Sequence, residues 1–455
     1  MSLSNLLGIA RSALIAHQRS MNVTAQNVAN ALTPGYTRRR LVLQSGGLSS
    51  YGTSVVGGGV LAGLILRDDD PFLDASYRRE SSFLGTSDTR LTFLEQIETS
   101  VGEPSDTGVA AALDDLFQAY SDLAANPTNT LEREQVRQAA RRFIERLHRL
   151  SGSLGQQADF ATEMMRSQVN EVNDITTRIA DLNQKIVVGA NGAGASPDLQ
   201  DQRDQLVDRL SELMAVKVEI QDNGSLTVIG GDTMLVDGSN HQKLDVVSMG
   251  ERGFGLQTEA GITLDPLAGS LEALSNLTAT ILPGMTDQLD RFVNAVVTEV
   301  NALHMTGYTA QGQTGVAFFD PAGTDAATIG LSAPIEASLD AIAAGRTPEP
   351  GDNSLALDLA ALAGQGIASL GNQTLSVYYT AFATSVGSDV QSARQDTEAG
   401  QVLVSQMESL RSSASGVSVD EEMVNLIAQQ EAYAAAARLL DVAQGIIQDL
   451  LDVVA

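Results

Sequence analysis

Apolar side chains recur at alternating spacings of three and four residues near both ends of the chain. An isolated helix with such a heptad stripe exposes its apolar side chains to water, so it needs a partner helix. We therefore expect two terminal helices that pair with each other first and meet other chains around that pair. The stripe residues that we expect to form the assembly interface are Leu3, Leu7, Leu14, Met21, Val28, Met423, Leu426, Tyr433, Leu440, Ile447 and Leu451.

Between the two ends, helical spacing dominates. Apolar residues keep a helical period over 131–188, which predicts one long helix that begins near Asn129, with a break at Gly152 and Gly155. A turn rich in Gly and Ala follows, and an amphipathic helix returns over 198–214. Further helices are expected from Pro283 to Gly307 and from about 375 to 413. The pattern predicts an elongated helical hairpin rather than a globular core.

Strands are expected in two places. The apolar runs 216–220 and 226–229 flank Asn223 and Gly224, a step that suits a tight hairpin turn, and short strands continue to about residue 247. A second patch, over 38–66, is rich in Val, Leu and Gly. The segment 309–352 carries many Gly and Pro residues and is expected to be loop-like.

Two local signals bound the terminal helices. Pro34 and Gly35 occupy the second and third positions of a turn that ends at Tyr36, as a type II turn requires. This structural turn ends the N-terminal helix and directs the chain outward. At the other end, Ser418 and Glu421 have the spacing of a capping box and begin the last helix.

Composition excludes several classes of function. With 56 acidic against 28 basic residues, the net charge of −28 repels nucleic-acid backbones and anionic lipid, so we expect neither as a partner. Apolar runs are shorter than the ~18 residues that suggest a membrane span. The first residues lack a secretion signal of basic and apolar regions, which leaves the cytoplasm or a specialised export route. No Cys is present, so disulfides and thiolate chemistry are excluded.

Candidate catalytic and metal-binding residues do not converge in the sequence. The four histidines are far apart, and none has the spacing of a compact ligand set. The Asp68–Asp70 run precedes Pro71 and is expected to be a solvated helix entry. Gly-rich stretches lack the Gly-Lys-Ser/Thr ending of a phosphate loop, and no Gly-x-Ser-x-Gly pattern is present. We expect no catalytic residue, no cofactor and no metal.

The same terminal residues carry a family resemblance. Gln26-Asn27-Val28-Ala29-Asn30, followed by Thr33-Pro34-Gly35-Tyr36-Thr37-Arg38, resembles the N-terminal motif of the flagellar rod, hook and hook-associated proteins. Tyr at the last position of this turn resembles the hook-associated group that forms the first junction between hook and filament. Rod and hook members more often have Phe at that position. The segments 415–422 and 192–206 are similar to that group as well.

This resemblance implies a mainly α fold: an elongated helical bundle with terminal coiled-coil helices and a small β portion. Both termini are expected in one inner domain, and a variable outer domain of larger relatives is expected to be reduced here. The expected division places an inner domain at 1–66 with 414–455, a helical rod at 67–215 with 270–310 and 353–413, a β portion at 216–269, and a reduced outer region at 311–352.

The implied function is structural and not enzymatic. The resemblance implies self-assembly into a ring or helical layer that links hook to filament, with the hook protein and a second junction protein as neighbours. It also implies export through the flagellar type III apparatus to the extracellular flagellum, with a cytoplasmic chaperone on the C-terminal helix. Two alternatives remain: another axial component, such as a second junction protein, distal rod protein or flagellin, or a flagellum-associated hydrolase on this scaffold.

Overall fold

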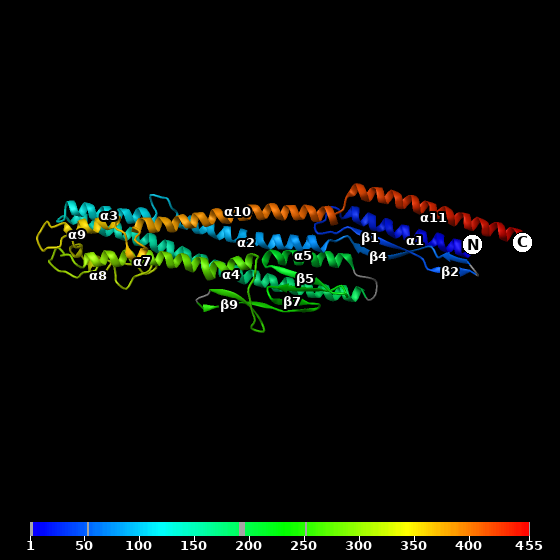
Figure 1. The fold of residues 1–455 in the computed structure, drawn as a ribbon, viewed down its shortest axis with the longest axis horizontal. Helices are drawn as coiled ribbons and strands as arrows, with labels where there is room; N and C mark the ends of the chain where they lie inside the picture. The colour runs from blue at the N-terminus through cyan, green and yellow to red at the C-terminus, as the bar shows by residue number, and fades with distance from the viewer. Residues whose placement is uncertain (1–2, 52–53, 191–195, 251–252, 455) are drawn as a thin grey trace.

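The protein is an elongated assembly of long helices, with both chain ends at the same extremity (Figure 1). The structure, a computed structural model, describes residues 3–51, 54–190, 196–250 and 253–454. The mainly α, elongated architecture expected from the sequence is confirmed. Two regions follow each other along the long axis, and the chain passes between them twice.

The first region contains both chain ends. Helices α1 and α11 run antiparallel and pack against each other, while strands β1 and β4 pair antiparallel alongside them (Figure 1). Strands β2 and β3 form a second antiparallel pair. The strands predicted over 38–66 are thus confirmed. We call these six elements the terminal module: α1 (Leu3–Ala29), β1 (Arg39–Ser45), β2 (Leu48–Tyr51), β3 (Ser54–Gly57), β4 (Val60–Arg67) and α11 (Val419–Val454).

The second region, which we call the rod, is built from the remaining helices and two small sheets. The helices expected at 198–214 and 375–413 are confirmed, each with ends within two residues of those expected. The rod helices are α2 (Pro71–Val101), α3 (Val109–Ala125), α4 (Thr130–Ala190), α5 (Pro197–Leu213), α6 (Ser270–Asn276), α7 (Leu282–His304), α8 (Ala333–Ala337), α9 (Ser354–Ala361) and α10 (Leu375–Ser415).

Helix α4 is continuous over 61 residues, so its length is about 90 Å at about 1.5 Å per residue. The break expected at Gly152 and Gly155 is therefore wrong. Both glycines are exposed, and a Cβ at either position would contact nothing within 4 Å. Their neighbours Leu150 and Leu154 are buried against the rod. Packing on that side outweighs the roughly 1 kcal/mol that each Gly costs a helix.

Helix α7 begins at Leu282, next to the expected Pro283, but the chain is already helical before that point. The helical path starts at Ser270 in α6 and continues through a π-helical turn at Leu277–Ile281 into α7. Proline has no backbone N–H and its ring crowds the preceding turn of an α-helix. A wider π-helical turn directly before Pro283 lets the helix continue through this position.

The β portion packs on α4. Strands β5 to β8 form one antiparallel sheet and β9 to β11 another, and the hairpin predicted around Gly224 is confirmed, with φ of +85° at that residue. Asn183 of α4 accepts from the Leu226 amide at 2.9 Å and donates to the Leu226 carbonyl at 2.8 Å. The strands are β5 (Val216–Ile220), β6 (Leu226–Gly230), β7 (Thr233–Asp237), β8 (Asn240–His241), β9 (Leu244–Ser248), β10 (Phe254–Thr258) and β11 (Thr263–Leu264).

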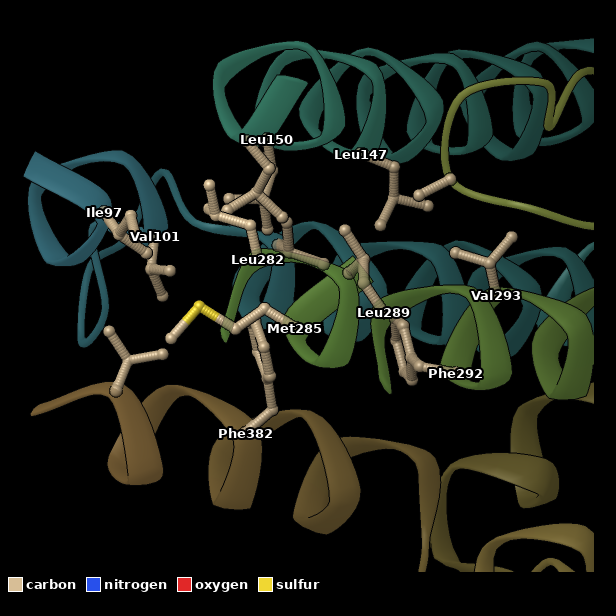
Figure 2. Close-up of a cluster of buried hydrophobic side chains, with 14 of the residues drawn as sticks. Ile97, Val101, Leu147, Leu150, Leu282, Met285, Leu289, Phe292, Val293 and Phe382 are labelled. Atoms are coloured by element: carbon tan, nitrogen blue, oxygen red, sulfur yellow. The ribbon is translucent and has the colours of Figure 1, made fainter. Parts of the chain in front are cut away.

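The rod has a large apolar core where four helices meet. Side chains from α2, α4, α7 and α10 converge there (Figure 2). Phe292 of α7 is at its centre, with its ring centroid 6.2 Å from that of Phe143 and 5.3 Å from that of Tyr379. The rod therefore buries an apolar core of its own without help from the terminal module.

The segment 309–352 is poor in regular structure, as expected, but it is packed against the rod. Phe318 and Phe319 are fully buried, and both of their amides donate to Asn301 Oδ1. His304 lies beneath them with Nδ1 2.7 Å from the Val316 carbonyl, while its Nε2 accepts from the Ala343 amide. The two longest continuously exposed stretches of the segment are 310–315 and 346–351. The segment closes the end of the rod rather than standing out from it.

Candidate assembly interface

The pairing of α1 with α11 buries a seam of small and polar side chains. On α11, Ala436 and Ala443 are buried, and Gln429 precedes them by one and two heptads. His17 of α1 faces Gln429, with its Nδ1 2.7 Å from Gln429 Oε1. Since a glutamine Oε1 only accepts, His17 donates through Nδ1. Small side chains at these positions let the two helix backbones approach closely.

On α11, part of the predicted stripe faces α1. At the heptad positions between those residues, the residue that faces α1 precedes the predicted position by one. Leu426, Leu440 and Ile447 are half-buried, as predicted, and alternate with Gln429, Ala436 and Ala443. By contrast, Met423, Tyr433 and Leu451 are exposed, so the expectation that they are buried in the helix pair is wrong. Apolar character misled the assignment because the alternate seam positions are filled by alanine and by hydrogen-bonded polar groups.

On α1 the predicted residues lie on the packed side. Leu7, Leu14, Met21 and Val28 are all half-buried. Leu3 belongs to the first turn of α1, and its side chain is outside the described part of the structure. The N-terminal stripe therefore marks the packed side of α1 for every residue whose side chain is described.

A buried hydrogen-bond cluster fixes the end of α1 against the start of α11. Asn27 is 1% exposed and uses all of its capacity: its Nδ2 donates to the Arg39 carbonyl and to Glu422 Oε2, each at 2.9 Å. Its Oδ1 accepts from Tyr36 Oη at 2.9 Å and from the Arg39 amide at 3.1 Å. Glu422 is also buried and lies 2.8 Å from Arg38 Nη2. Three segments of chain meet at these residues: the end of α1, the stretch 36–39 and the start of α11.

The turn at Pro34, Gly35 and Tyr36 is part of this cluster. The Tyr36 amide donates to the Thr33 carbonyl at 3.2 Å, and Gly35 has φ of +72°, as the predicted type II turn requires. Gln205 of α5 donates to the Pro34 carbonyl at 2.8 Å, and a Cβ on Gly35 would lie 2.1 Å from Gln205 Nε2. The turn thus docks the terminal module on α5.

Arginine and aspartate side chains form a chain of ion pairs from the terminal module into the rod, which we call the Arg–Asp ladder. Asp198, Asp201, Asp204 and Asp208 recur at helical spacing along one side of α5. The ladder pairs are Arg39 with Asp198 and Asp201, Arg67 with Asp201 and Asp204, Arg78 with Asp204 and Asp208, and Arg411 with Asp208 and Asp74.

Burial and the neighbouring charges shift the pKa values of several ladder residues. Burial raises the pKa of Asp201 above its ordinary value, although Arg67 and Arg39 oppose that effect. For Arg67, burial alone would lower the pKa, but the charges of Asp204 and Asp201 raise it above its ordinary value. Burial also raises the pKa of Tyr36, whose ring lies 4.5 Å from the Arg39 guanidinium. Paired buried charges of this kind specify geometry strongly, because removing one partner leaves the other unpaired.

Sequence reasoning missed the ladder and the Asn27 cluster. Asp residues at helical spacing in 198–208 were visible, but their partners are about 130 to 200 residues away. The capping box was only partly correct: the Glu421 amide is 3.5 Å from Ser418 Oγ, while the Glu421 carboxylate pairs with Arg38 at 3.4 Å. The expected helix entry is confirmed, because Asp70 accepts from the Phe72 and Leu73 amides.

The described residues contain neither a metal-binding cluster nor a membrane-spanning helix. Within these ranges, no group of three or more His, Asp or Glu side chains is placed to hold a metal ion. No helix in the described part of the chain combines the length and apolarity needed to cross a bilayer. His148 contacts the Ile329 carbonyl and His241 lies on β8, far from His17 and His304 along the chain.

Comparisons with known proteins agree with this architecture. A family model described as the flagellar hook-associated protein FlgK helical domain matches residues 94–319. A model of the flagellar basal body rod FlgEFG protein C-terminal region matches 410–453, and one of the flagella basal body rod protein matches 7–37. The three models thus cover both helices of the terminal module and much of the rod.

Relatives match over most of the chain. The flagellar hook-associated protein 1 of Bacillus subtilis is 27% identical, with 99% of this chain and 98% of that protein aligned. The protein of the same name from Salmonella typhimurium is 29% identical, but the match covers 70% of this chain and 59% of that protein. A solved structure of the flagellar hook junction protein FlgK from Burkholderia pseudomallei superposes with a TM-score of 0.64 over 76% of this chain and all of that chain, at 16% identity. In sequence over nearly its whole length, and in fold, the chain is thus similar to flagellar hook-associated protein 1.

Proposed function

We propose that this chain is a structural subunit of the bacterial flagellum that joins the hook to the filament and assembles with copies of itself. Its relatives are named flagellar hook-associated protein 1, and the similar solved structure is that of a flagellar hook junction protein. The observation that carries the proposal here is the outward side of α11. A helix that leaves a row of large apolar side chains in water is suited to burial against other chains.

The row lies opposite the seam. Val424 is 67% exposed, Ile427 53%, Val442 58% and Ile446 41%. At about 100° per residue, Val424, Ile427 and Val442 lie about 100° or more around the helix from Ala436 and Ala443, which face α1, whereas Ile446 lies at the edge of the seam. Helix α1 therefore buries one side of α11 and leaves the other side exposed for contact with other chains.

The predicted interface residues divide between two roles. Leu7, Leu14, Met21, Val28, Leu426, Leu440 and Ile447 hold the helix pair within one chain. Met423, Tyr433 and Leu451 are free to meet neighbouring chains. The turn at Pro34, Gly35 and Tyr36 sets the angle between the terminal module and the rod.

The proposed partners are other copies in a ring or helical layer, the hook protein on one side and a second junction protein on the other. Before assembly, a cytoplasmic export chaperone covers the apolar side of α11, and the flagellar type III apparatus exports the chain. The final location is the extracellular flagellum. Within the chain, the proposed division is an inner domain at 1–66 with 414–455, a helical rod at 67–215 with 270–310 and 353–413, a β portion at 216–269 and a reduced outer region at 311–352.

The role is mechanical, not catalytic, with no cofactor or metal. The competing function is a flagellum-associated hydrolase on this scaffold. Purified protein incubated with cell-wall fragments or casein should release no product, and hydrolysis that disappears with a point variant would favour the competing function.

A deletion strain tests the main proposal. Loss of the chain should leave cells with hooks but no filaments, and flagellin should accumulate in the medium. Complementation with the natural chain should restore filaments, and immunogold label should mark the base of each filament. Filaments of normal length on the deletion strain would contradict the proposal.

A further inference from the structure

A groove on the terminal module has no occupant within its own chain. It encloses about 840 Å³ between α1, the β1–β4 pair and the start of α5. Apolar side chains line much of it: Val23 from α1, Leu41 from β1, Leu64 and Leu66 from β4, and Pro197 from α5. Leu64 is 62% exposed and Leu66 41%. Large apolar side chains in a concave surface are suited to receiving an apolar segment of another molecule.

The far end of α11 presents the complementary shape. Leu451 follows Ile447 by four residues and so continues the seam, yet it is 62% exposed whereas Ile447 is half-buried. In Figure 1, α11 runs past the N-terminal end of α1, so α1 does not cover the last part of α11. Ile446 is exposed in the same part of the helix. The last turns of α11 thus carry apolar side chains that their own chain does not cover.

Charge favours the same match. Arg19 is exposed at the groove, and within the described residues it forms no ion pair. The end of α11 carries Asp449 and Asp452, both exposed and, among described residues, also without an ion pair. The other arginine at the groove, Arg67, is engaged in the Arg–Asp ladder. An acidic helix end therefore finds one available cation, Arg19, at a groove whose lining also includes the exposed carboxylate of Asp69.

The groove and the helix end lie at opposite ends of the terminal module. Residues 19–26 of α1 are beside the rod, whereas α11 ends beyond the first residues of α1 (Figure 1). The distance along α1 from Leu3 to Asn22 is about 30 Å at about 1.5 Å per residue. The helix end cannot reach the groove of its own chain without unfolding the module. The occupant must come from another chain.

We infer that the end of α11 in one copy docks in the groove between α1, β4 and α5 of the next copy, with Leu451 and Ile446 against Leu64 and Leu66 and with Asp449 or Asp452 near Arg19. This inference rests on the proposed self-assembly and names its surfaces. Because the two surfaces differ, the contact is head-to-tail, and repetition of it builds a row of subunits rather than a closed pair.

Cysteine cross-linking tests the contact directly, because the chain has no Cys of its own. Two strains carry the chain with Leu64→Cys and Leu451→Cys together, or with Leu32→Cys and Leu451→Cys as the control. Leu32 is 97% exposed and does not line the groove. A disulfide requires Cα atoms within about 7 Å. Mild oxidation of isolated flagella should give a ladder of cross-linked multimers for the first variant and none for the control.

The outcomes separate the inference from the function on which it rests. Full incorporation of both variants into flagella without a multimer ladder would overturn the docking and leave the proposed function intact. Failure of the natural chain to appear at the base of filaments would overturn the proposed function itself. A ladder in both variants would mean that the ends are mobile and would also overturn specific docking.

A binding measurement does not depend on export or assembly. A fluorescent peptide of residues 438–455 should bind the full chain, and Leu64→Asp should weaken that binding at least about ten-fold, which corresponds to about 1.4 kcal/mol. Leu61→Asp, also exposed on β4 but outside the groove, is the matched control and should change affinity less than about two-fold. Arg19→Asp should weaken binding, and a peptide with Asp449→Arg and Asp452→Arg should restore it. Equal affinity for all chains would overturn the inference.

Discussion

The terminal module and the rod use different means of holding helices together. In the rod, rings and branched side chains such as Phe143, Phe292 and Tyr379 fill a continuous core. In the module, the described buried side chains are small, as Ala436 and Ala443 are, or polar, as Asn27 and Glu422 are. The rod thus satisfies its apolar groups internally, whereas the module leaves large ones on its surface. Under the proposed function, folding depends mainly on the rod and assembly on the terminal module.

The strongest way to break this comparison is to open the helix pair of the module. Leu440→Asp combined with Ile447→Asp places two carboxylates at half-buried seam positions, where an unpaired charge is costly to bury. We expect complete loss of filament assembly, while the melting temperature of the rod, followed by circular dichroism, stays near that of the natural chain.

Gln444→Asp with Gln448→Asp is the matched control, because both positions are exposed on the same helix and gain the same charge. The double control should assemble. The variant must also be detected in the medium, since α11 is the proposed chaperone site. Normal filaments on cells that make only the seam variant would contradict the assignment of assembly to the module.

The next largest effect is expected in the rod core. Phe292→Ala removes a ring that is 1% exposed and should lower the free energy of unfolding by about 3 to 5 kcal/mol, measured by chemical denaturation. Ile427→Ala, on the outward side of α11, should change that free energy by less than about 0.5 kcal/mol but impair assembly. If the two variants destabilised the chain equally, the contrast between the regions would be lost.

Acid should weaken the rod through His304. Burial lowers the pKa of His304 from 6.5 to about 4. Because the folded-state pKa is below the unfolded one, the neutral form is favoured by folding; this stability is present above pH 6.5 and is lost as the pH falls from 6.5 to 4. The loss is about 3 kcal/mol at full protonation.

His304→Gln provides the test, since a glutamine amide can replace both hydrogen bonds of the ring and does not titrate in this range. The difference in unfolding free energy between the two chains should shrink as the pH falls from 7 to 4. An unchanged difference across that range would mean that another group causes the pH dependence.

The smallest effect is expected at the exposed tip of the segment 309–352. An eight-residue Gly/Ser insertion between Pro348 and Glu349 should change the unfolding free energy by less than about 0.5 kcal/mol and preserve motility. Arg346 is a poorer site, because its side chain lies 2.7 Å from Asp358. The same insertion between Phe318 and Phe319 should unfold the end of the rod. Equal tolerance of both insertions would show that the segment is not packed as described.

The sequence predicted features that depend on local periodicity. The extent of α4, expected at 131–188, agrees with the observed Thr130–Ala190, and the Gly224 hairpin and the Gly35 turn follow from backbone preferences. The one-residue shift of the α11 seam was missed because alanine and glutamine look unremarkable in a hydrophobic pattern. Burial of Phe318 was missed because Gly and Pro around it suggested only a loop.

The candidate site was predictable in part. The stripes identified the helices that pair, but the Asn27 cluster reaches Glu422, 395 positions away, and the Arg–Asp ladder joins α5 to arginines about 130 to 200 positions away. Arg39 and Asp201, for example, are separated by 162 residues, and no local signal pairs them. Such contacts depend on the tertiary fold, so only the type of residue and its spacing on α5 could be read beforehand.

The ladder also determines how the molecule carries force. The chain crosses between module and rod at 68–70 and at 416–418. Arg38 links the two crossings: its amide donates to the Ser415 carbonyl at 2.9 Å, and its carbonyl accepts from the Asp68 amide at 2.9 Å. Arg411 joins both to α5 through Asp74 and Asp208. A pull along the long axis is therefore shared by two backbones and several lateral ion pairs in parallel. Tension acts on the two backbone crossings and the ion pairs at the same time, not on one after another. The narrow connection between module and rod can therefore transmit torque without bending.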